Sequence, residues 1–341
     1  MRPILALLAA VAAAFPAAAA PLLVIAHRGA SGERPEHTLA AYERAIDAGA
    51  DFIEPDLVAT KDLVLIARHE TELSDTTDIA ARAEFADRKR TKSVEGRMVT
   101  GWFAEDFTLA EIRTLRAKER LPALRPANVR FDGLYQVPTF EEIAALAKAK
   151  SAEKGRAIGL YPELKHPTML MEQAGIDMVD LMATALRKAG LDKAEDRVFV
   201  QIFEVAPLQR LNRLVEVPLV LLISSEGGPY DEKSLRWKDM MTPAGLAEIA
   251  KYADGIGPHM GHVLGSDGTA TRLVADAHAA GLKVHPWTLR KENSFLPPAL
   301  HNPGGPAATG KVAELVAQLK RAGVDGVFTD DPALVVPAVR R

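Results

Sequence analysis

The chain alternates between short apolar runs rich in β-branched residues and longer stretches with the period of a helix. Apolar runs occur at 22–26, 52–58, 63–67, 157–164, 198–203, 218–224, 254–258, 282–289 and 325–330. Helix-period stretches between them include 139–150, 174–188, 243–253, 271–281 and 311–323. This repeated alternation favours a parallel sheet, because a crossover helix must carry the chain back before the next parallel strand begins.

About eight strand candidates fit a closed (β/α)₈ barrel, the TIM barrel, which typically takes ~250 residues. The chain has 341 residues, and its excess fits an insertion over about 75–137, which follows the second strand region, is polar and lacks a barrel period. An open doubly wound sheet is the competing fold, but no Gly-rich phosphate loop follows the first strand. We therefore predict a single α/β domain over 21–341, a TIM barrel with this insertion.

The first twenty residues differ from the rest of the chain. Arg2 precedes an apolar run from Ile4 to Ala14, and small residues follow at 17–20. The run is too short to span a bilayer, which takes roughly 20 residues. We predict a signal peptide over 1–20, cleaved near Ala19 or Ala20, with a retained N-terminal anchor as the alternative. The mature protein should then be exported, periplasmic in a cell with two membranes, and without a membrane-inserted segment.

Composition excludes several functions. The formal net charge is −3 with no basic run, which argues against nucleic acid as a partner. The chain has no cysteine, so disulfides and thiolate metal sites are both excluded.

Two pairs of polar residues with i, i+2 spacing lie at the ends of apolar runs, Glu54 with Asp56 and Glu163 with Lys165. In a strand, residues i and i+2 point to the same face, so the members of each pair should project together. Carboxylate oxygens suit a hard cation such as Ca²⁺ or Mg²⁺. Two unpaired carboxylates beside an apolar core would be costly without one. The alternatives are solvated surface acids for the first pair and a plain ion pair for the second.

His27 and Arg28 follow the first apolar run, and His69 follows the run at 63–67. Active-site groups of a barrel come from the C-terminal ends of several strands, where these residues should lie. Histidine has the right ordinary pKa for proton transfer near neutrality, and a guanidinium can bind two phosphate oxygens at once. Together with the acidic pairs, these residues predict a site for a hard cation and a phosphate.

Five ordered motifs now make a family resemblance specific. HRGASGERPEHT, the E-x-D run, RHE, ELK and GVDGVFTDDP span 27–332 and resemble the glycerophosphodiester phosphodiesterase family, in particular its exported, periplasmic-type members. The resemblance implies a TIM barrel with a divalent cation and two histidines that act as acid and base. It implies that the metal ligands are Glu54, Asp56 and Glu163. The acid/base pair would be His27 and His69, and the phosphate contacts would be Arg28 and Lys165.

The reaction implied by the resemblance converts a small-molecule glycerophosphodiester and water into glycerol 3-phosphate and an alcohol. Ca²⁺ is preferred over Mg²⁺ because an exported setting supplies it and the resemblance points to it. The sequence leaves open which histidine is the acid and which the base. It also leaves open whether water attacks directly or the glycerol 2-hydroxyl attacks through a cyclic phosphate. Trp287 either lines the substrate pocket or packs in the barrel core, and the insertion should fold over the barrel mouth and shape the alcohol pocket.

Two other functions stay open at this stage. A lipid-directed phosphodiesterase of phospholipase D or C type would need an apolar acyl groove, which the charged insertion does not suggest. An exported solute-binding protein could share the leader and the α/β alternation, but it would have no reason to hold two histidines and three acids at strand ends.

The chain departs from the family pattern at two positions. PEHT carries His37 where the family has asparagine, and RHE carries Arg68 where many members have an apolar residue. We expect the first departure to change a contact around the site and the second to change how His69 is oriented.

Overall fold

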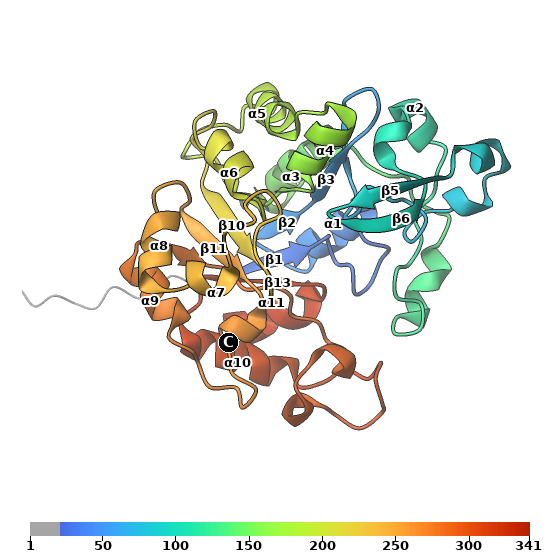
Figure 1. The fold of residues 1–341 in the computed structure, drawn as a ribbon. Coiled ribbons are helices and arrows are strands. Elements are labelled where there is room, and N and C mark those ends of the chain that lie inside the picture. The colour runs from blue at the N-terminus through green and yellow to red at the C-terminus, as the bar shows by residue number, and fades with distance from the viewer. Residues whose placement is uncertain (1–20) are drawn as a thin grey trace, which may run out of the picture.

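The computed structural model describes residues 21–341, in which parallel strands are surrounded by helices (Figure 1). The strands are β1 (Leu23–His27), β2 (Phe52–Glu54), β3 (Asp56–Ala59), β4 (Leu65–Ala67), β5 (Arg90–Val94), β6 (Arg97–Gly101), β7 (Gly159–Leu160), β8 (Glu163–Leu164), β9 (Val200–Ile202), β10 (Leu219–Ile223), β11 (Gly255–Pro258), β12 (Lys283–Val284) and β13 (Gly326–Thr329). The α-helices are α1 (Leu39–Asp47), α2 (Leu109–Ile112), α3 (Phe140–Lys154), α4 (Pro167–Ala174), α5 (Met178–Ala189), α6 (Val205–Leu211), α7 (Trp237–Met240), α8 (Pro243–Ile249), α9 (Leu273–Ala279), α10 (Val312–Ala322) and α11 (Pro332–Arg340).

The parallel strands close into the predicted barrel. One run has the order β13-β1-β2-β7, and the other has the order β12-β11-β10-β9-β8-β3, with β4 antiparallel to β3. At the seam between β12 and β13, Asp325 N donates to Val284 O at 3.0 Å and Leu289 N donates to Phe328 O at 2.8 Å. The two runs join where β2 passes into β3 and β7 into β8. The fold is therefore the TIM barrel and not an open sheet.

Two prolines interrupt strands that the sequence predicts as continuous. Pro55 separates β2 from β3, and Pro162 lies between β7 and β8, because proline has no N–H to donate to the ladder. Hydrogen bonding resumes at once, since Glu163 N donates to Pro55 O and Gln201 N donates to Pro162 O, both at 2.9 Å. The prolines therefore interrupt the ladder beside the acidic residues without opening the barrel.

Apolar side chains fill both the inside and the outside of the barrel. The inner cluster contains Ile25, Phe52, Tyr161, Val220 and Phe328, all buried. A larger cluster packs the outward strand faces against the helices. Both faces of most barrel strands are thus buried, which explains why these strands read as continuous apolar runs rather than alternating ones.

The helices follow their sequence signals, with one difference. Thr139 caps α3 in a capping box with Glu142, as predicted. The helix predicted over 174–188 instead begins at Met178, because α4 ends at Ala174 and Gly175 takes the left-handed conformation with φ 66°. Asp177 then accepts a hydrogen bond from Asp180 N and starts the new helix.

The segment 75–137 lies on one side of the barrel and contains the β5–β6 hairpin and α2 (Figure 1). Its apolar side chains, such as Ile79, Phe85 and Phe107, form one cluster with Val58 and Ile66 of the β3–β4 hairpin. Sequence alone suggests a solvated cap here, since the charged residues hide the apolar spacing. The structure shows a charged surface over a small apolar core.

The signal peptide predicted over 1–20 lies outside the described residues. Within 21–341, no helix combines the length and the apolar character needed to cross a bilayer.

Candidate active site

The predicted site residues converge at the C-terminal end of the barrel. His27 ends β1 beside Glu54, which ends β2, and Asp56 begins β3 in register with Glu163 of β8. A cavity of about 90 Å³ at this end is lined by residues that include His27, Arg28, Glu54, His69, Glu163 and Trp287. The structure therefore brings together side chains that are up to 260 positions apart in the chain (27 to 287).

Three carboxylates form a buried cluster. Ligand oxygens of Glu54, Asp56 and Glu163 all lie within 4.8 Å of one another, and each residue is at most 5% exposed. Oδ1 of Asp56 is buried without a hydrogen-bond partner in the structure. Buried carboxylates this close repel one another unless a cation or protons neutralise them. A set of only carboxylate oxygens with one such unpaired atom fits a hard divalent cation.

The pKa shifts of this cluster reflect the crowding. Burial, together with the neighbouring Asp56 and Glu163 charges, raises the pKa of Glu54 well above its usual value. Burial also raises the pKa of Glu163 to about 8, against the pull of Lys165. Burial opposes ionisation of Asp56 too, but the hydrogen bond from His37 and the charge of Arg28 hold its pKa well below the usual range. Asp56 is thus the carboxylate that stays charged before any cation binds.

His27 is fixed through one ring nitrogen. Its Nδ1 lies 2.7 Å from Oδ1 of Asp330, just beyond the end of β13. Burial keeps Asp330 from solvent, yet Arg290 and Arg125 hold its pKa well below the usual range, so its ionised carboxylate accepts the Nδ1 proton. Burial, with help from Arg28, lowers the pKa of His27 to about 4. The ring is therefore neutral near pH 7, with Nε2 as its unprotonated nitrogen.

His69 is held in the same way. Its Nδ1 lies 2.5 Å from Oε1 of the adjacent residue, Glu70. Burial and then the charges of Arg28 and Lys165 lower the pKa of His69, although 31% of the side chain is exposed. The side chain lines both the small cavity and a larger side cavity next to it.

Cationic side chains flank the carboxylates. Lys165 Nζ donates to Glu163 at 2.7 Å, and Nε of Arg28 lies 3.2 Å from Oδ2 of Asp56. Both cations are buried, so they raise the local positive potential where an anionic group would enter. Trp287 lines the same cavity, and its Nε1 donates to the carbonyl oxygen of Gly257 at 2.7 Å. Trp287 also packs against the inner apolar cluster, so it lies where the pocket wall meets the barrel core.

The two departures from the family motif have clear structural partners. His37 is fully buried and bridges the hydroxyl of Tyr42, at 2.8 Å, and Oδ2 of Asp56, at 3.0 Å. It therefore holds one of the three clustered carboxylates. Arg68 is also buried, and its Nη1 donates to the carbonyl oxygen of Glu36 at 3.3 Å. Arg68 thus holds the backbone at Glu36, and no hydrogen bond joins its side chain to the His69 ring.

Gln201 and Asp330 lie in the apolar runs at 198–203 and 325–330, and no sequence pattern gives either residue a role. Gln201 Nε2 donates to Oε1 of Glu54 at 3.0 Å, and Asp330 holds His27. The sequence could have pointed to Glu70, because it directly follows His69 in the RHE motif. No sequence pattern points to Arg120 or Arg125 of the insertion, because their partners in the barrel are far away in the chain.

The side cavity has a volume of about 700 Å³ and opens beside His69 and Lys165. Its walls come from the insertion hairpin, with Glu95 and Arg97, and from the segment 224–237, with Tyr230. It carries acidic, basic and aromatic side chains. Its position and volume suit a polar group attached to the phosphate.

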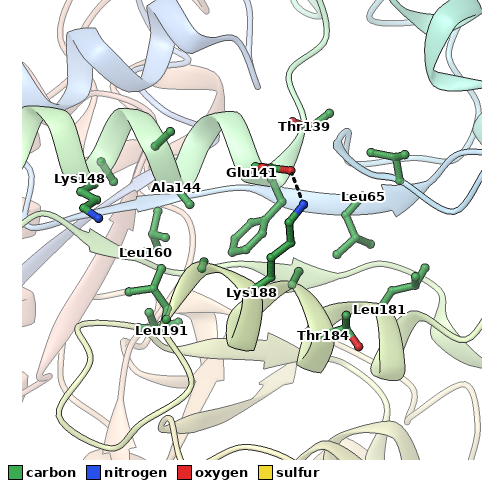
Figure 2. Close-up of a pocket in the computed structure, with 18 of the residues that line it drawn as sticks. Leu65, Thr139, Glu141, Ala144, Lys148, Leu160, Leu181, Thr184, Lys188 and Leu191 are labelled. Carbon is green, nitrogen blue, oxygen red and sulfur yellow. Dashed lines mark hydrogen bonds and ion pairs between the residues drawn. The ribbon is translucent and has the colours of Figure 1, made fainter.

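A second hollow lies away from this site. An apolar groove of about 700 Å³ runs between α3 and α5, lined by side chains such as Leu65, Leu160 and Leu181. Figure 2 shows Lys188 of α5 reaching across it to Glu141 of α3, at 3.1 Å. The groove lies toward the N-terminal ends of β7 and β9, and it shares no lining residue with the two cavities at the site.

Two solved structures share the fold of this protein. A glycerophosphoryl diester phosphodiesterase from Silicibacter pomeroyi, described as putative in its own report, superposes with a TM-score of 0.67 at 23% identity, covering 94% of both chains. A phosphodiesterase from Oleispira antarctica, solved in complex with the product sn-glycerol-3-phosphate, superposes with a TM-score of 0.62 at 20% identity. That match covers 94% of this chain and 98% of the other. These likenesses support the barrel fold.

Sequence comparisons place the chain in a family. The model of the glycerophosphoryl diester phosphodiesterase family matches residues 27–334. The glycerophosphodiester phosphodiesterase GDPD6 of Arabidopsis thaliana is 36% identical over 321 residues, covering 90% of this chain and 82% of the relative. A glycerophosphodiester phosphodiesterase of Haemophilus influenzae is 32% identical, covering 91% and 87%. The chain therefore belongs to the glycerophosphoryl diester phosphodiesterase family and is an enzyme of that activity.

Proposed function

We propose that this enzyme hydrolyses glycerophosphodiesters to glycerol 3-phosphate and an alcohol by two-histidine general acid/base catalysis, with a divalent cation held by Glu54, Asp56 and Glu163. The observation that carries the proposal is the pairing of the two histidines. Each is fixed at Nδ1 by a carboxylate, and both line one small cavity with the three clustered acids.

A divalent cation in the carboxylate cluster would supply positive charge to the phosphoryl oxygens. Arg28 and Lys165 add two more cations, and the guanidinium can bind two phosphate oxygens at once. One histidine accepts at Nε2 a proton from the attacking group, either water or the glycerol 2-hydroxyl, and the other donates a proton to the leaving alkoxide. The donor must first be protonated, and a bound phosphodiester anion favours this because it raises the pKa of a neighbouring imidazole.

The first prediction concerns metal dependence of the purified mature protein, residues 21–341. With sn-glycero-3-phosphocholine as substrate, we expect formation of glycerol 3-phosphate and choline, loss of activity in excess EDTA, and recovery on adding Ca²⁺ more fully than on adding Mg²⁺. A coupled glycerol-3-phosphate dehydrogenase assay measures the product. Full activity in EDTA, or release of phosphocholine, would contradict the proposal.

Acyl chains find no obvious binding place at this site, which argues against the lipid-directed alternative. The apolar groove between α3 and α5 lies toward the N-terminal ends of β7 and β9, away from the site. Lysophosphatidylcholine is therefore expected to be a poor substrate when the release of choline, which accompanies its hydrolysis to lysophosphatidic acid, is measured.

We further propose that the insertion selects the alcohol through its hairpin, because Glu95 and Arg97 line the side cavity. Arg97 is exposed, so its charge acts through solvent and its effect on a substrate is modest. Replacing Arg97 with alanine should raise kcat/KM for glycerophosphocholine relative to glycerophosphoglycerol by roughly two- to five-fold, because a cation that repels choline is removed. An unchanged ratio of the two kcat/KM values would show that Arg97 of the hairpin does not govern specificity.

Export is proposed from the leader pattern at 1–20. N-terminal sequencing of the protein recovered from the periplasmic fraction should find a start near residue 20 or 21, and a start at Met1 would contradict it.

A further inference from the structure

Two arginines of the insertion donate hydrogen bonds to the carboxylates that hold the two histidines. Nη1 and Nη2 of Arg120 donate to the two oxygens of Glu70, at 2.9 and 2.6 Å, and Glu70 in turn bonds Nδ1 of His69. Nη2 of Arg125 donates to Oδ2 of Asp330 at 2.6 Å, while the other oxygen of Asp330 bonds Nδ1 of His27. Two hydrogen-bonded series thus run from the insertion to the barrel, and each passes from an arginine through a carboxylate to a histidine.

The series from Arg125 through Asp330 to His27 is almost completely shielded from solvent. Arg125 is 7% exposed, Asp330 is 2% exposed, and Glu292, which accepts from Nε of Arg125 at 2.7 Å, is fully buried. Charge-assisted hydrogen bonds gain strength and directional precision when water is excluded. Arg290 also donates to Asp330, at 2.9 Å, so this carboxylate is held by two cations.

Arg120 also reaches the phosphate-binding side of the site. Its Nε and Nη2 donate to the two oxygens of Glu36, at 2.8 and 2.7 Å, and Glu36 accepts from Nη1 of Arg28 at 3.2 Å. One guanidinium therefore spans two carboxylates, each of which contacts a different functional side chain. A lysine ammonium cannot reproduce this planar, two-sided geometry.

We infer that Arg120 and Arg125 are positioning residues for the catalytic histidines, so that the insertion completes the catalytic machinery and does not act only on specificity. The inference rests on the proposed acid/base roles of His27 and His69. A fixed carboxylate keeps the proton on Nδ1 and turns Nε2 toward the substrate. When such a carboxylate is lost, a histidine of the wrong tautomer can lower kcat by up to about 10⁴-fold, as the serine-protease triad illustrates.

The kinetic test compares Arg120→Ala and Arg120→Lys with Arg130→Ala. Arg130 is an exposed arginine of the same insertion that contacts the ring of Phe131 and lies outside the site. We expect Arg120→Ala to lower kcat by roughly 10- to 100-fold, the usual range for an outer partner of a functional side chain, and Arg120→Lys to recover only part of it. Arg130→Ala should keep wild-type kcat and KM.

A double-mutant cycle separates positioning from simple anchoring of the insertion. If Arg120 acts through Glu70, the Arg120→Ala/Glu70→Ala enzyme should be about as slow as Glu70→Ala alone. Fully multiplicative losses would overturn the assignment. For the buried arginine we use Arg125→Lys, which keeps a charge beside Asp330 and Glu292, and confirm folding by near-ultraviolet circular dichroism.

Imidazole ¹⁵N spectra give a readout that does not depend on turnover. We expect the Nδ1-protonated form of His69 to dominate in the wild-type protein and in Arg130→Ala, and to lose population to the Nε2-protonated form in Arg120→Ala. The same change is expected for His27 in Arg125→Lys. Unchanged tautomers together with unchanged kcat would overturn the positioning role. Changed tautomers with unchanged kcat would instead show that the histidines are not the acid and base, so the two failures are distinguishable.

Discussion

Replacing His27 or His69 with alanine is expected to lower kcat by roughly 10²–10⁴-fold, the usual range for the loss of a general acid or base. Each ring lines the small cavity, and each presents the nitrogen that its carboxylate partner leaves free. The two losses should be similar in size, because the attacking and leaving groups both need a proton transfer. KM should change less than kcat, since Arg28 and Lys165 remain to bind the phosphate.

The control for these variants is His278→Ala, on the outer helix α9, where the ring pairs with Asp325 at 2.8 Å and is 41% exposed. It should keep kcat, and circular dichroism should show that all three variants fold. A His27→Ala or His69→Ala enzyme with near-wild-type kcat would mean that the histidine in question is structural.

The carboxylate cluster should determine metal affinity. We expect Asp56→Asn to weaken Ca²⁺ binding by about 10²-fold or more, beyond the 10- to 100-fold typical of outer-shell partners, as measured by isothermal titration calorimetry. The affinity of the unmodified protein should rise as the pH increases toward 8. Glu163, whose pKa is raised to about 8, must lose its proton before it can bind a cation.

The matched control is Asp75→Asn, an exposed carboxylate in the insertion. Its Ca²⁺ affinity should equal that of the unmodified protein. If Asp56→Asn bound Ca²⁺ as tightly as Asp75→Asn, the cation would have to bind elsewhere.

Local sequence patterns predicted the parts of this molecule that depend on neighbouring residues. The i, i+2 spacing of Glu54 and Asp56 was enough to predict that their carboxylates converge, and the structure brings them together with Glu163. The barrel followed from the strand–helix alternation, because a parallel strand can be reached only through a crossover. The boundary error at 174–188 arose because a helical period continues across Gly175, whose left-handed conformation ends one helix before the next begins.

Contacts between distant segments could not be predicted in this way. Arg120 lies 84 positions from Glu36, and Arg125 lies 205 positions from Asp330, so no local period relates them. The insertion also contains the charged run Arg88-Lys89-Arg90, which is typical of a solvated segment, whereas Phe85 and Phe107 of the same insertion belong to an apolar core. An ion pair across the fold becomes visible only once the tertiary structure places both partners.

The apolar cluster of the insertion, which meets the barrel at Val58 and Ile66, has a consequence for how the enzyme would be inactivated. A segment with its own small core can open as a cooperative unit at a lower free energy than global unfolding requires. Because Arg120 and Arg125 belong to that unit, its opening would release both histidines while the barrel kept its hydrogen-bonded ring. Catalysis would then cease under mild heating or low denaturant in a molecule that still gives the circular dichroism of a folded barrel, and it would return once the unit refolded.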